Sequence, residues 1–216
     1  MVTGTTRTEG PPRPILGPRV AQYVVQRLEE RGHKVTLMDP KQLPLLEKPE
    51  FAYSPSQKPP LLQKLRIQLT DVDAYVAITP EYNHAPSPGL VNFFNHFGSS
   101  VFSFKPSAIV SYSAGQWGGT RAALALRPIL SELGCLPVSA MVHVPHAADV
   151  WDEQGHWQAG QDEDAWQTYT DRCWEQLEWW ATAAKEYKQR ADPWANSPPF
   201  QSSPSQRNAP SQKPSA

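Results

Sequence analysis

Apolar residues occur along this chain in two patterns, and the two patterns alternate. Ala74–Ile78 and Ala108–Val110 are short unbroken apolar runs, which is typical of strands buried on both faces of a parallel sheet. The segments around them carry apolar residues at steps of three and four, the spacing of one face of a helix. Strands that alternate with helices predict an α/β fold with a parallel sheet and right-handed crossovers.

Five helices and two further strands complete this prediction. The helices are expected at 17–31, 61–69, 90–97, 120–133 and 162–190, and the strands at 33–39 and 137–144. Gly32 and Gly134 follow two of the helices, at positions where glycine commonly ends a helix. Prolines punctuate the stretch from Pro40 to Pro60, which is expected to be an extended surface loop.

Composition narrows the class of protein and its partners. The net charge is -1 and the basic residues form no run, so neither nucleic acid nor an anionic membrane is expected as a partner. No stretch reaches the roughly 18 to 20 apolar residues of a membrane span. The N-terminus carries no apolar segment that resembles a secretion signal, so a cytoplasmic protein is expected. Its two cysteines, Cys135 and Cys173, are therefore expected to be reduced thiols. Residues 1–191 are expected to form one domain, and residues 192–216, rich in Pro, Ser and Gln, a disordered tail.

Two predicted strands lead into loops that are suited to holding a flat ligand. Thr79–Gly89 follows the apolar run 74–78, and Ser111–Gly119 follows the strand expected at 106–111. Ligands of open α/β sheets bind at these carboxyl ends of the strands. Prolines fix the backbone of the first loop, whereas glycines let the backbone of the second loop approach a ligand closely. Both loops are therefore candidate binding loops.

These loops carry a family resemblance. The sequence T-P-E-Y-N-H, followed by P-G and N-F-F-N-H, resembles the flavin-contacting loop of the NADPH-dependent FMN reductase family, which includes quinone, azo-dye and chromate reductases. Ser111–Arg121 resembles the second flavin loop of that family, and Gly4–Arg7 resembles its phosphate loop. The resemblance implies FMN as the cofactor and a flavodoxin-like doubly wound sheet with the strand order 2-1-3-4-5.

The resemblance also implies a role for individual residues. The FMN phosphate is expected at Thr5, Thr6 and Arg7, supported by the dipole of the next helix if that helix begins nearby. The isoalloxazine is expected along Pro80, Glu81, Tyr82 and Asn83, with Ser113, Ala114, Gly115, Gln116 and Gly118 as the opposing wall. His84 and Trp117 are expected to contact the substrate. His84 could instead cap the following helix, and Trp117 could belong to packing or to a dimer interface.

A flavin carries the redox chemistry itself, so no catalytic acid, base or nucleophile is expected from the protein. NADPH or NADH would supply electrons to a small-molecule acceptor such as a quinone, an azo compound, a free flavin or a metal oxyanion. Because one open face would serve both substrates in turn, ping-pong kinetics are expected. The three histidines and three acids of residues 143–156 match no tight metal-binding spacing, so no metal site is expected.

The start of the chain departs from the family pattern. Only Met1 and Val2 precede the phosphate-loop resemblance, where the family has a whole apolar strand, and the stretch Thr8–Leu16 is longer than usual. The expectation is a shortened first strand, or a sequence that starts downstream of the true beginning. This departure leaves an alternative open, a flavodoxin-like interaction protein with weak or lost FMN binding.

Aromatic residues on the helix 162–190 predict a homodimer or homotetramer.

Overall fold

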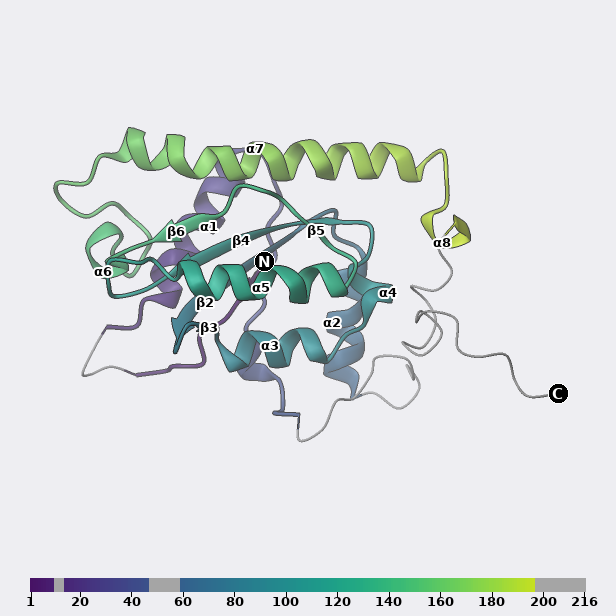
Figure 1. Cartoon of the computed structure of the whole chain (residues 1–216), viewed down its shortest axis with the longest axis horizontal. Helices are drawn as coiled ribbons and strands as arrows, with labels where there is room; N and C mark the ends of the chain where they lie inside the picture. The colour runs from purple at the N-terminus through teal and green to yellow at the C-terminus, as the bar shows by residue number, and fades with distance from the viewer. Residues whose placement is uncertain (10–13, 47–58, 197–216) are drawn as a thin grey trace.

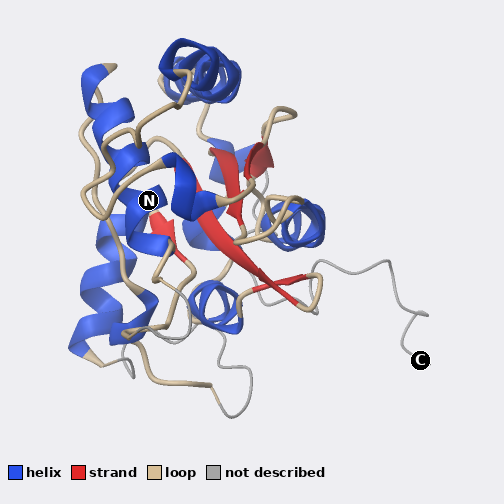
Figure 2. Ribbon diagram, turned by 90° about the vertical axis from the view of Figure 1, so that its left-hand side faces the viewer, coloured by secondary structure: helices blue, strands red, loops and turns tan. Residues whose placement is uncertain are grey.

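The computed structural model describes residues 1–9, 14–46 and 59–196, and the predicted tail lies outside the described residues from residue 197 onward. Within them, helices cover both faces of one twisted sheet (Figure 1, Figure 2). The strands are β1 (Val2–Thr3), β2 (Tyr75–Tyr82), β3 (Ala85–Pro86), β4 (Pro106–Tyr112), β5 (Leu136–Pro137) and β6 (Val142–Val144). The helices are α1 (Gly17–Glu30), η1 (Pro40–Gln42), α2 (Pro60–Thr70), α3 (Pro88–Asn95), α4 (Ser99–Phe102), α5 (Thr120–Glu132), α6 (Ala147–Val150), α7 (Glu163–Lys188) and α8 (Pro193–Asn196).

The central strand β2 pairs in parallel with β1 on one side and with β4 on the other. Val2 and Thr3 of β1 pair with Ala77 and Ile78, and β4 pairs in turn with β5 and β6. On the far side of β1, Met38 forms a parallel bridge with Val2. When the parallel strands are counted in chain order, β1 is the first, the bridge at Met38 stands for the second, β2 is the third, β4 the fourth, and β5 with β6 the fifth. Their order across the sheet is therefore 2-1-3-4-5, as predicted.

Two strands are shorter than the sequence prediction. The strand expected at 33–39 is reduced to the bridge at Met38, because the two residues of β1 give it little backbone to pair with. The strand expected at 137–144 is split into β5 and β6. Between them, Oε1 of Gln176 on α7 accepts hydrogen bonds from Ala140 N and Ser139 Oγ, at 3.0 and 2.9 Å. A side chain thus takes the place of a strand partner at the break.

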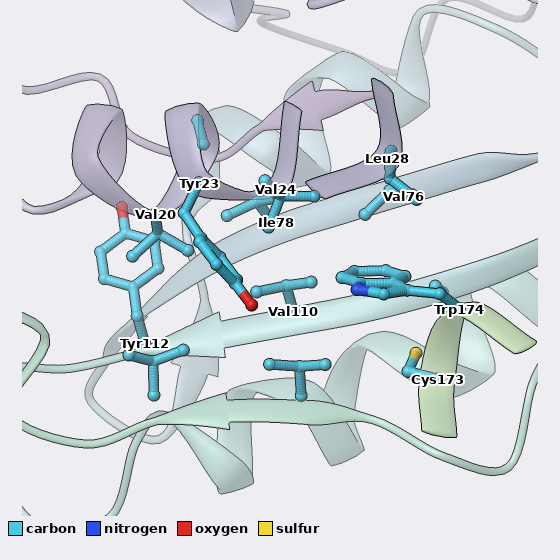
Figure 3. Close-up of a cluster of buried hydrophobic side chains, with 14 of the residues drawn as sticks. Val20, Tyr23, Val24, Leu28, Val76, Ile78, Val110, Tyr112, Cys173 and Trp174 are labelled. Carbon is cyan, nitrogen blue, oxygen red and sulfur yellow. The ribbon is translucent and has the colours of Figure 1, made fainter. Parts of the chain in front are cut away.

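Alternate residues of β2 enter two hydrophobic layers, one on each face of the sheet. Val76 and Ile78 pack with residues of α1 and α7, among them the fully buried Trp174 (Figure 3). Tyr75 and Ala77 pack on the opposite face with residues of α2, α3 and α5. Because helices cover both faces, neither face of this strand needs polar residues. This is why its sequence is an unbroken apolar run.

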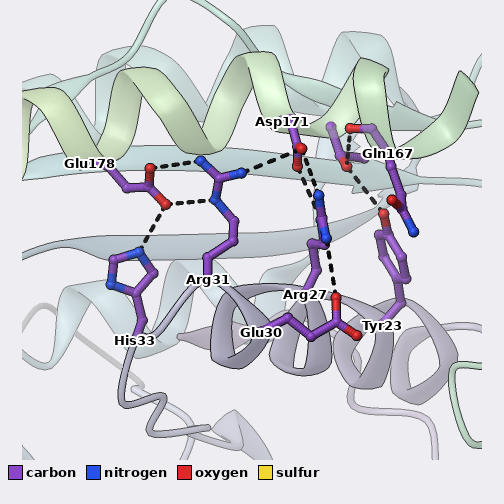
Figure 4. Close-up of polar contacts among 9 residues, drawn as sticks. Tyr23, Arg27, Glu30, Arg31, His33, Gln167, Asp171 and Glu178 are labelled. Carbon is purple, nitrogen blue, oxygen red and sulfur yellow. Dashed lines mark hydrogen bonds and ion pairs between the residues drawn. The ribbon is translucent and has the colours of Figure 1, made fainter. Parts of the chain in front are cut away.

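Charged side chains also join α1 to α7 (Figure 4). Arg27 donates hydrogen bonds to both carboxylate oxygens of Asp171, at 3.1 and 2.6 Å. Arg31 does the same to Glu178, at 2.6 and 2.7 Å, and His33 Nε2 lies 2.9 Å from that carboxylate. The hydrogen bonds from Arg31 lower the pKa of Glu178 and keep it charged. These bidentate pairs fix α7 in place along α1.

Candidate active site

A cleft of about 470 Å³ opens at the carboxyl edge of the sheet, where the segments that follow β1, β2 and β4 meet. This volume falls within the range of cofactor and small-molecule sites. The cleft is lined by Thr5, Arg7, Pro14, Ile15, Leu16, Pro80, Glu81, Tyr82, Asn83, His84, Tyr112, Ser113, Ala114, Gly115 and Trp117. A larger cavity of about 680 Å³ lies at the opposite edge and contains none of the predicted site residues. We assign the site to the carboxyl edge because parallel sheets bind ligands there.

The first predicted loop is a tight β-hairpin. β2 continues through Tyr82 and turns back into β3, so that Tyr82 pairs with Ala85. Only Asn83 and His84 form the turn, and both have positive φ angles, 49° and 64°. Such a two-residue turn follows the twist of the strands, but Asn-Gly is the usual pair in it. Histidine at the glycine position is strained.

Ser87 caps the helix that follows this hairpin. Its hydroxyl accepts a hydrogen bond from Leu90 N at 3.2 Å and donates one to the Gly4 carbonyl. The capping alternative for His84 is therefore wrong, because the cap position is occupied by another residue. His84 lies in the lining of the cleft, and its contact with a substrate stays a prediction. The same serine ties the hairpin to the segment after β1.

The segment after β1 lies directly against the N-terminus of α1. A Cβ on Gly17 would overlap the Thr5 side chain and would lie 2.7 Å from the Tyr112 hydroxyl. Glycine at this first helical position therefore lets Thr5 approach the end of the helix. Burial raises the pKa of Tyr112 well above its ordinary value and keeps the phenol neutral, although a hydrogen bond to Thr5 acts the other way. The sequence predicted support from the helix dipole only if the next helix begins nearby. The N-terminus of α1 does lie beside Thr5, one of the residues predicted to bind the phosphate.

Hydrogen bonds from neighbouring strands fix the second loop. Ser111 Oγ donates to the Gly118 carbonyl at 2.8 Å, and Ser113 N donates to the Val144 carbonyl at 3.1 Å. Gly118 has a φ of 58°, and a Cβ there would lie 2.9 Å from Pro145 N. Any larger residue would push this loop away from the end of β6. These contacts therefore hold the second loop in one position, where it forms one wall of the cleft.

Three of the predicted residues lie outside the lining of the cleft. The Thr6 methyl group is directed at Gly89 in α3. The Gln116 side chain is exposed, and Gly118 supports its loop from behind. The predicted roles of these three residues remain untested, but the structure gives each of them a neighbour or an environment other than the cleft.

Two parts of the lining were not predicted from the sequence. Tyr112 is the last residue of β4 and lies within the predicted second loop, but it was not assigned to the site. Its position in that loop could have identified it. Residues 14–16 close the cleft beside α1. They belong to the long proline-rich insertion, which carries no motif and whose residues 10–13 lie outside the described part of the chain.

Glu81 brings a buried charge to the wall of the cleft. Its side chain is 11% exposed, and its Oε1 lies 3.5 Å from Nη1 of Arg121. Its other oxygen, Oε2, is buried and has no hydrogen-bond partner among the described residues. A buried acceptor without a partner costs free energy. An N–H or O–H group of a ligand in the cleft would remove that cost.

Comparison with known proteins decides the family. The family model for NADPH-dependent FMN reductases matches residues 10–149, more than half of the chain. The chain belongs to this family. An NAD(P)H-dependent FMN reductase of Pseudomonas aeruginosa is 32% identical over 128 residues, which cover 57% of this chain and 68% of the relative. An NADPH azoreductase of Bacillus sp. is 30% identical over 123 residues, which cover 56% and 62% of the two chains.

A solved structure supports the same fold for this FMN reductase family member. FerB, a flavoenzyme NAD(P)H:(acceptor) oxidoreductase from Paracoccus denitrificans, superposes with a TM-score of 0.65 at 18% identity, over 82% of this chain and 94% of FerB. At that identity the likeness shows the flavodoxin-like fold alone. The family match begins at residue 10, so the predicted role of Thr5 and Arg7 rests on their place in the cleft lining and on the contact of Thr5 with α1.

The residues of the cleft fit the FMN cofactor that the family implies. The donors suited to a phosphate are Arg7, the Thr5 hydroxyl and the first backbone N–H groups of α1, all at one end of the cleft. The walls suited to a flat ring are the hairpin and the second loop. The unpartnered Oε2 of Glu81 lies in one of these walls and can accept a hydrogen bond from a ring N–H or a sugar hydroxyl. Family membership also implies NAD(P)H as the electron donor.

The histidine-rich segment 143–156 contains the end of β6, helix α6 and a turn at residues 152–156. Oδ1 of Asp152 accepts hydrogen bonds from Gln154 N and His156 N, both at 2.9 Å. Among residues 1–9, 14–46 and 59–196, no three His, Cys, Asp or Glu side chains are grouped to hold a metal ion. In the same part of the chain, no helix combines the length and the apolar character needed to cross a membrane.

Proposed function

We propose that this protein binds FMN in the cleft and passes electrons from NADPH or NADH to a small-molecule acceptor by a ping-pong mechanism. The observation that carries the proposal is the convergence of three separate segments, at Thr5, Glu81 and Ser113, on one cleft at the carboxyl edge of the sheet. When bound there, FMN would supply the redox chemistry by taking up and releasing electrons. The protein binds, orients and screens the reacting groups.

Each wall would contribute a separate part of the binding. Thr5 and Arg7 would hold the phosphate against the positive end of α1. The hairpin residues Pro80 to Asn83 and the loop residues Ser113 to Gly115 would enclose the ring. Backbone N–H groups of these loops are suited to stabilise negative charge that develops on the reduced ring, because they are fixed before the reaction begins.

The open side of the cleft would take the donor and the acceptor in turn. His84 lies at the tip of the hairpin, and Trp117, which is 59% exposed, lies in the opposite wall. One open side supports the ping-pong mechanism, since the oxidised donor must leave before the acceptor enters. The relative named NADPH azoreductase supports a flat aromatic acceptor.

The exposed aromatic side chains of α7 support the proposed homodimer or homotetramer. Trp179, Trp180 and Tyr187 are 62%, 42% and 65% exposed and lie on one long helix. Exposed apolar groups that gather in this way usually mark a protein interface. The cytoplasmic location stays a prediction from the sequence. Measurement of the molar mass in solution, for the native chain and a Trp179→Ser, Trp180→Ser variant, would test the assembly.

The visible absorption spectrum tests the proposed function. The purified protein is mixed with FMN, passed through a desalting column and then given NADPH without oxygen. We expect a retained flavin spectrum that bleaches with NADPH and returns with a quinone. Initial rates at several concentrations of both substrates should give parallel double-reciprocal lines. Loss of FMN on the column at micromolar protein would contradict the proposal and favour the alternative of an interaction protein.

A further inference from the structure

Arg121 connects the two walls of the cleft. It is the second residue of α5, and its Nη1 lies 3.5 Å from Oε1 of Glu81 in the hairpin. Its guanidinium carbon lies 5.2 Å from the centroid of the Trp117 ring in the second loop. The contact between Arg121 and Glu81 therefore joins the hairpin that follows β2 to the helix that follows β4, across 40 residues of sequence.

The backbone of Trp117 is fixed, but its indole projects into solvent. The Trp117 carbonyl accepts hydrogen bonds from Thr120 N and Thr120 Oγ1, at 3.1 and 2.8 Å. The side chain itself is 59% exposed, so burial alone does not hold the ring in one position. A guanidinium over its face attracts the ring electrostatically and limits its rotation.

Glu81 explains why the guanidinium stays over the ring. Its carboxylate is almost fully buried, whereas 42% of the Arg121 side chain is exposed. A buried charge keeps its counterion close, because separation would leave the carboxylate both unsolvated and unpaired. Arginine can pair with a carboxylate through one edge and stack on a ring through its plane at the same time. Lysine cannot do both.

We propose that Arg121 is a positioning residue, anchored by Glu81, that holds the Trp117 indole as one wall of the open side of the cleft. The inference rests on the proposed function in one respect, since the wall serves the substrates that enter there. Trp117 would meet the substrate, and Arg121 would act through Trp117. Arg121 and Trp117 together thereby set how tightly a flat substrate is bound, with little effect on the electron transfer step.

The first test needs no cofactor. The protein is labelled with 5-fluorotryptophan, and the ¹⁹F resonance of Trp117 among the eight tryptophans is assigned with Trp117→Phe. We expect Arg121→Met to shift and narrow this resonance, because the ring gains motion. Arg66→Met, a change of a partly exposed arginine on α2, is the matched control and should leave it unchanged. An unchanged Trp117 resonance in Arg121→Met would overturn the proposal.

Arg121→Met leaves Glu81 without its counterion and could unfold the protein. The double variant Glu81→Gln, Arg121→Met removes both charges and keeps the test available. We expect the same change of the Trp117 resonance in the double variant, and a smaller change in the same direction in Arg121→Lys, which keeps the charge but not the planar group. A Trp117 resonance that stays native in the double variant would also overturn the proposal.

Steady-state kinetics with a quinone provide the second test. Arg121→Met should raise the KM for the quinone about threefold to fivefold, as expected for an exposed cation–π contact, and leave kcat within about twofold. In a Trp117→Leu background the same change should have no further effect on KM, because Arg121 acts through the ring. Additive effects in the two variants would contradict the positioning role. Failure of the native protein to retain FMN would instead contradict the proposed function, while the ¹⁹F result would still decide the inference.

Discussion

Lys105 and Glu81 are charged side chains buried at opposite ends of the sheet, and they differ in how their hydrogen bonds are satisfied. Lys105, just before β4, donates to the carbonyls of Leu69 and Thr70 at 2.9 and 2.5 Å and lies 3.1 Å from the Tyr75 hydroxyl. Glu81, near the end of β2, has one oxygen near Arg121 and one without a partner.

The difference separates a charge whose hydrogen bonds are complete within the fold from one that has an acceptor left unpaired. All three protons of the Lys105 ammonium have partners within the fold, so it closes the end of α2 against the sheet and has no capacity left for a ligand. Glu81 keeps an unpaired acceptor at the cleft, which is unfavourable in the absence of a ligand. Burial alone would therefore not have distinguished the two, whereas the count of hydrogen bonds does.

The largest effect is expected from Lys105→Met. The substitution keeps much of the side-chain stem but removes the Lys105 donor from the Thr70 carbonyl and leaves the Leu69 carbonyl with the Tyr75 hydroxyl alone. We therefore expect a loss of about 3 kcal/mol in the free energy of unfolding. Urea denaturation measures it. FMN affinity should not change, because Lys105 lies at the edge of the sheet away from the cleft. A weakened FMN affinity in the folded variant would show that the two ends of the sheet are coupled.

The pH dependence of the same variant sharpens the prediction. Burial lowers the pKa of Lys105 to about 8, from the ordinary value of 10.5. Between these two values the unfolded chain still holds the proton while the folded protein has released it, so folding gains stability as the pH rises through this range. The difference in unfolding free energy between the native protein and Lys105→Met should therefore increase from pH 8 to pH 10. A constant difference would contradict a lowered pKa.

Gly17→Ala should cost about 2 kcal/mol of stability, since the added methyl group would overlap Thr5 and force one of the two segments to move. Unlike Lys105→Met, it should also weaken FMN binding, because the shift separates Thr5 from the N-terminus of α1. Thermal unfolding and a fluorescence titration with FMN measure the two effects. Gln22→Ala is the control: Gln22 is an exposed residue of the same helix and lies outside the cleft lining, so neither effect is expected. Normal FMN affinity in Gly17→Ala would disconnect α1 from the phosphate site.

Glu81→Gln should separate function from stability. The carboxamide keeps the shape but loses the charge and one acceptor oxygen, so FMN should bind about tenfold more weakly. The melting temperature should stay the same or rise, because a buried charge with a poorly satisfied oxygen has been removed. Titration with FMN and calorimetry test this pair of outcomes. A large loss of stability without a loss of affinity would place Glu81 in the same class as Lys105.

The smallest effect is expected from His84→Gly, which should stabilise the protein by about 1 kcal/mol because glycine relieves the left-handed strain at the hairpin tip. If the imidazole contacts the substrate, the same variant should show a reduced kcat/KM. His146→Gly is a matched control, since His146 is an exposed histidine with a φ of 45° outside the cleft lining. It should gain similar stability with unchanged kinetics. Unchanged kinetics in His84→Gly would mean that its strain serves no catalytic purpose.

The sequence predicted the parts of this molecule that depend on local pattern. The apolar runs identified β2 and β4, and the order of the elements predicted the sheet. The split between β5 and β6 was not predictable, because it depends on Gln176, which lies far along the chain on α7. The hairpin was missed because its turn is Asn-His and lacks the glycine that normally signals it.

The same division holds within the site. Most cleft residues lie in the two loops that the sequence singled out, because the carboxyl ends of parallel strands share one edge. The relation of Glu81 to Arg121 and Trp117 could not be predicted, since it depends on how α5 lies against the hairpin. The contact between Thr5 and Gly17 depends likewise on the path of the chain between them, which carries no motif.

The ion pairs between α1 and α7 have a consequence for the order of folding. Arg27 and Asp171 are 144 positions apart, so their contact closes one of the longest loops in the chain. The cost in chain entropy rises with loop length, and contacts between distant residues tend to form late. The sheet contacts of β2 with β4 join segments much closer in sequence. We therefore expect the central strands to assemble first. The helix α1, which backs the end of the cleft proposed for the phosphate, should be fixed only when α7 has docked.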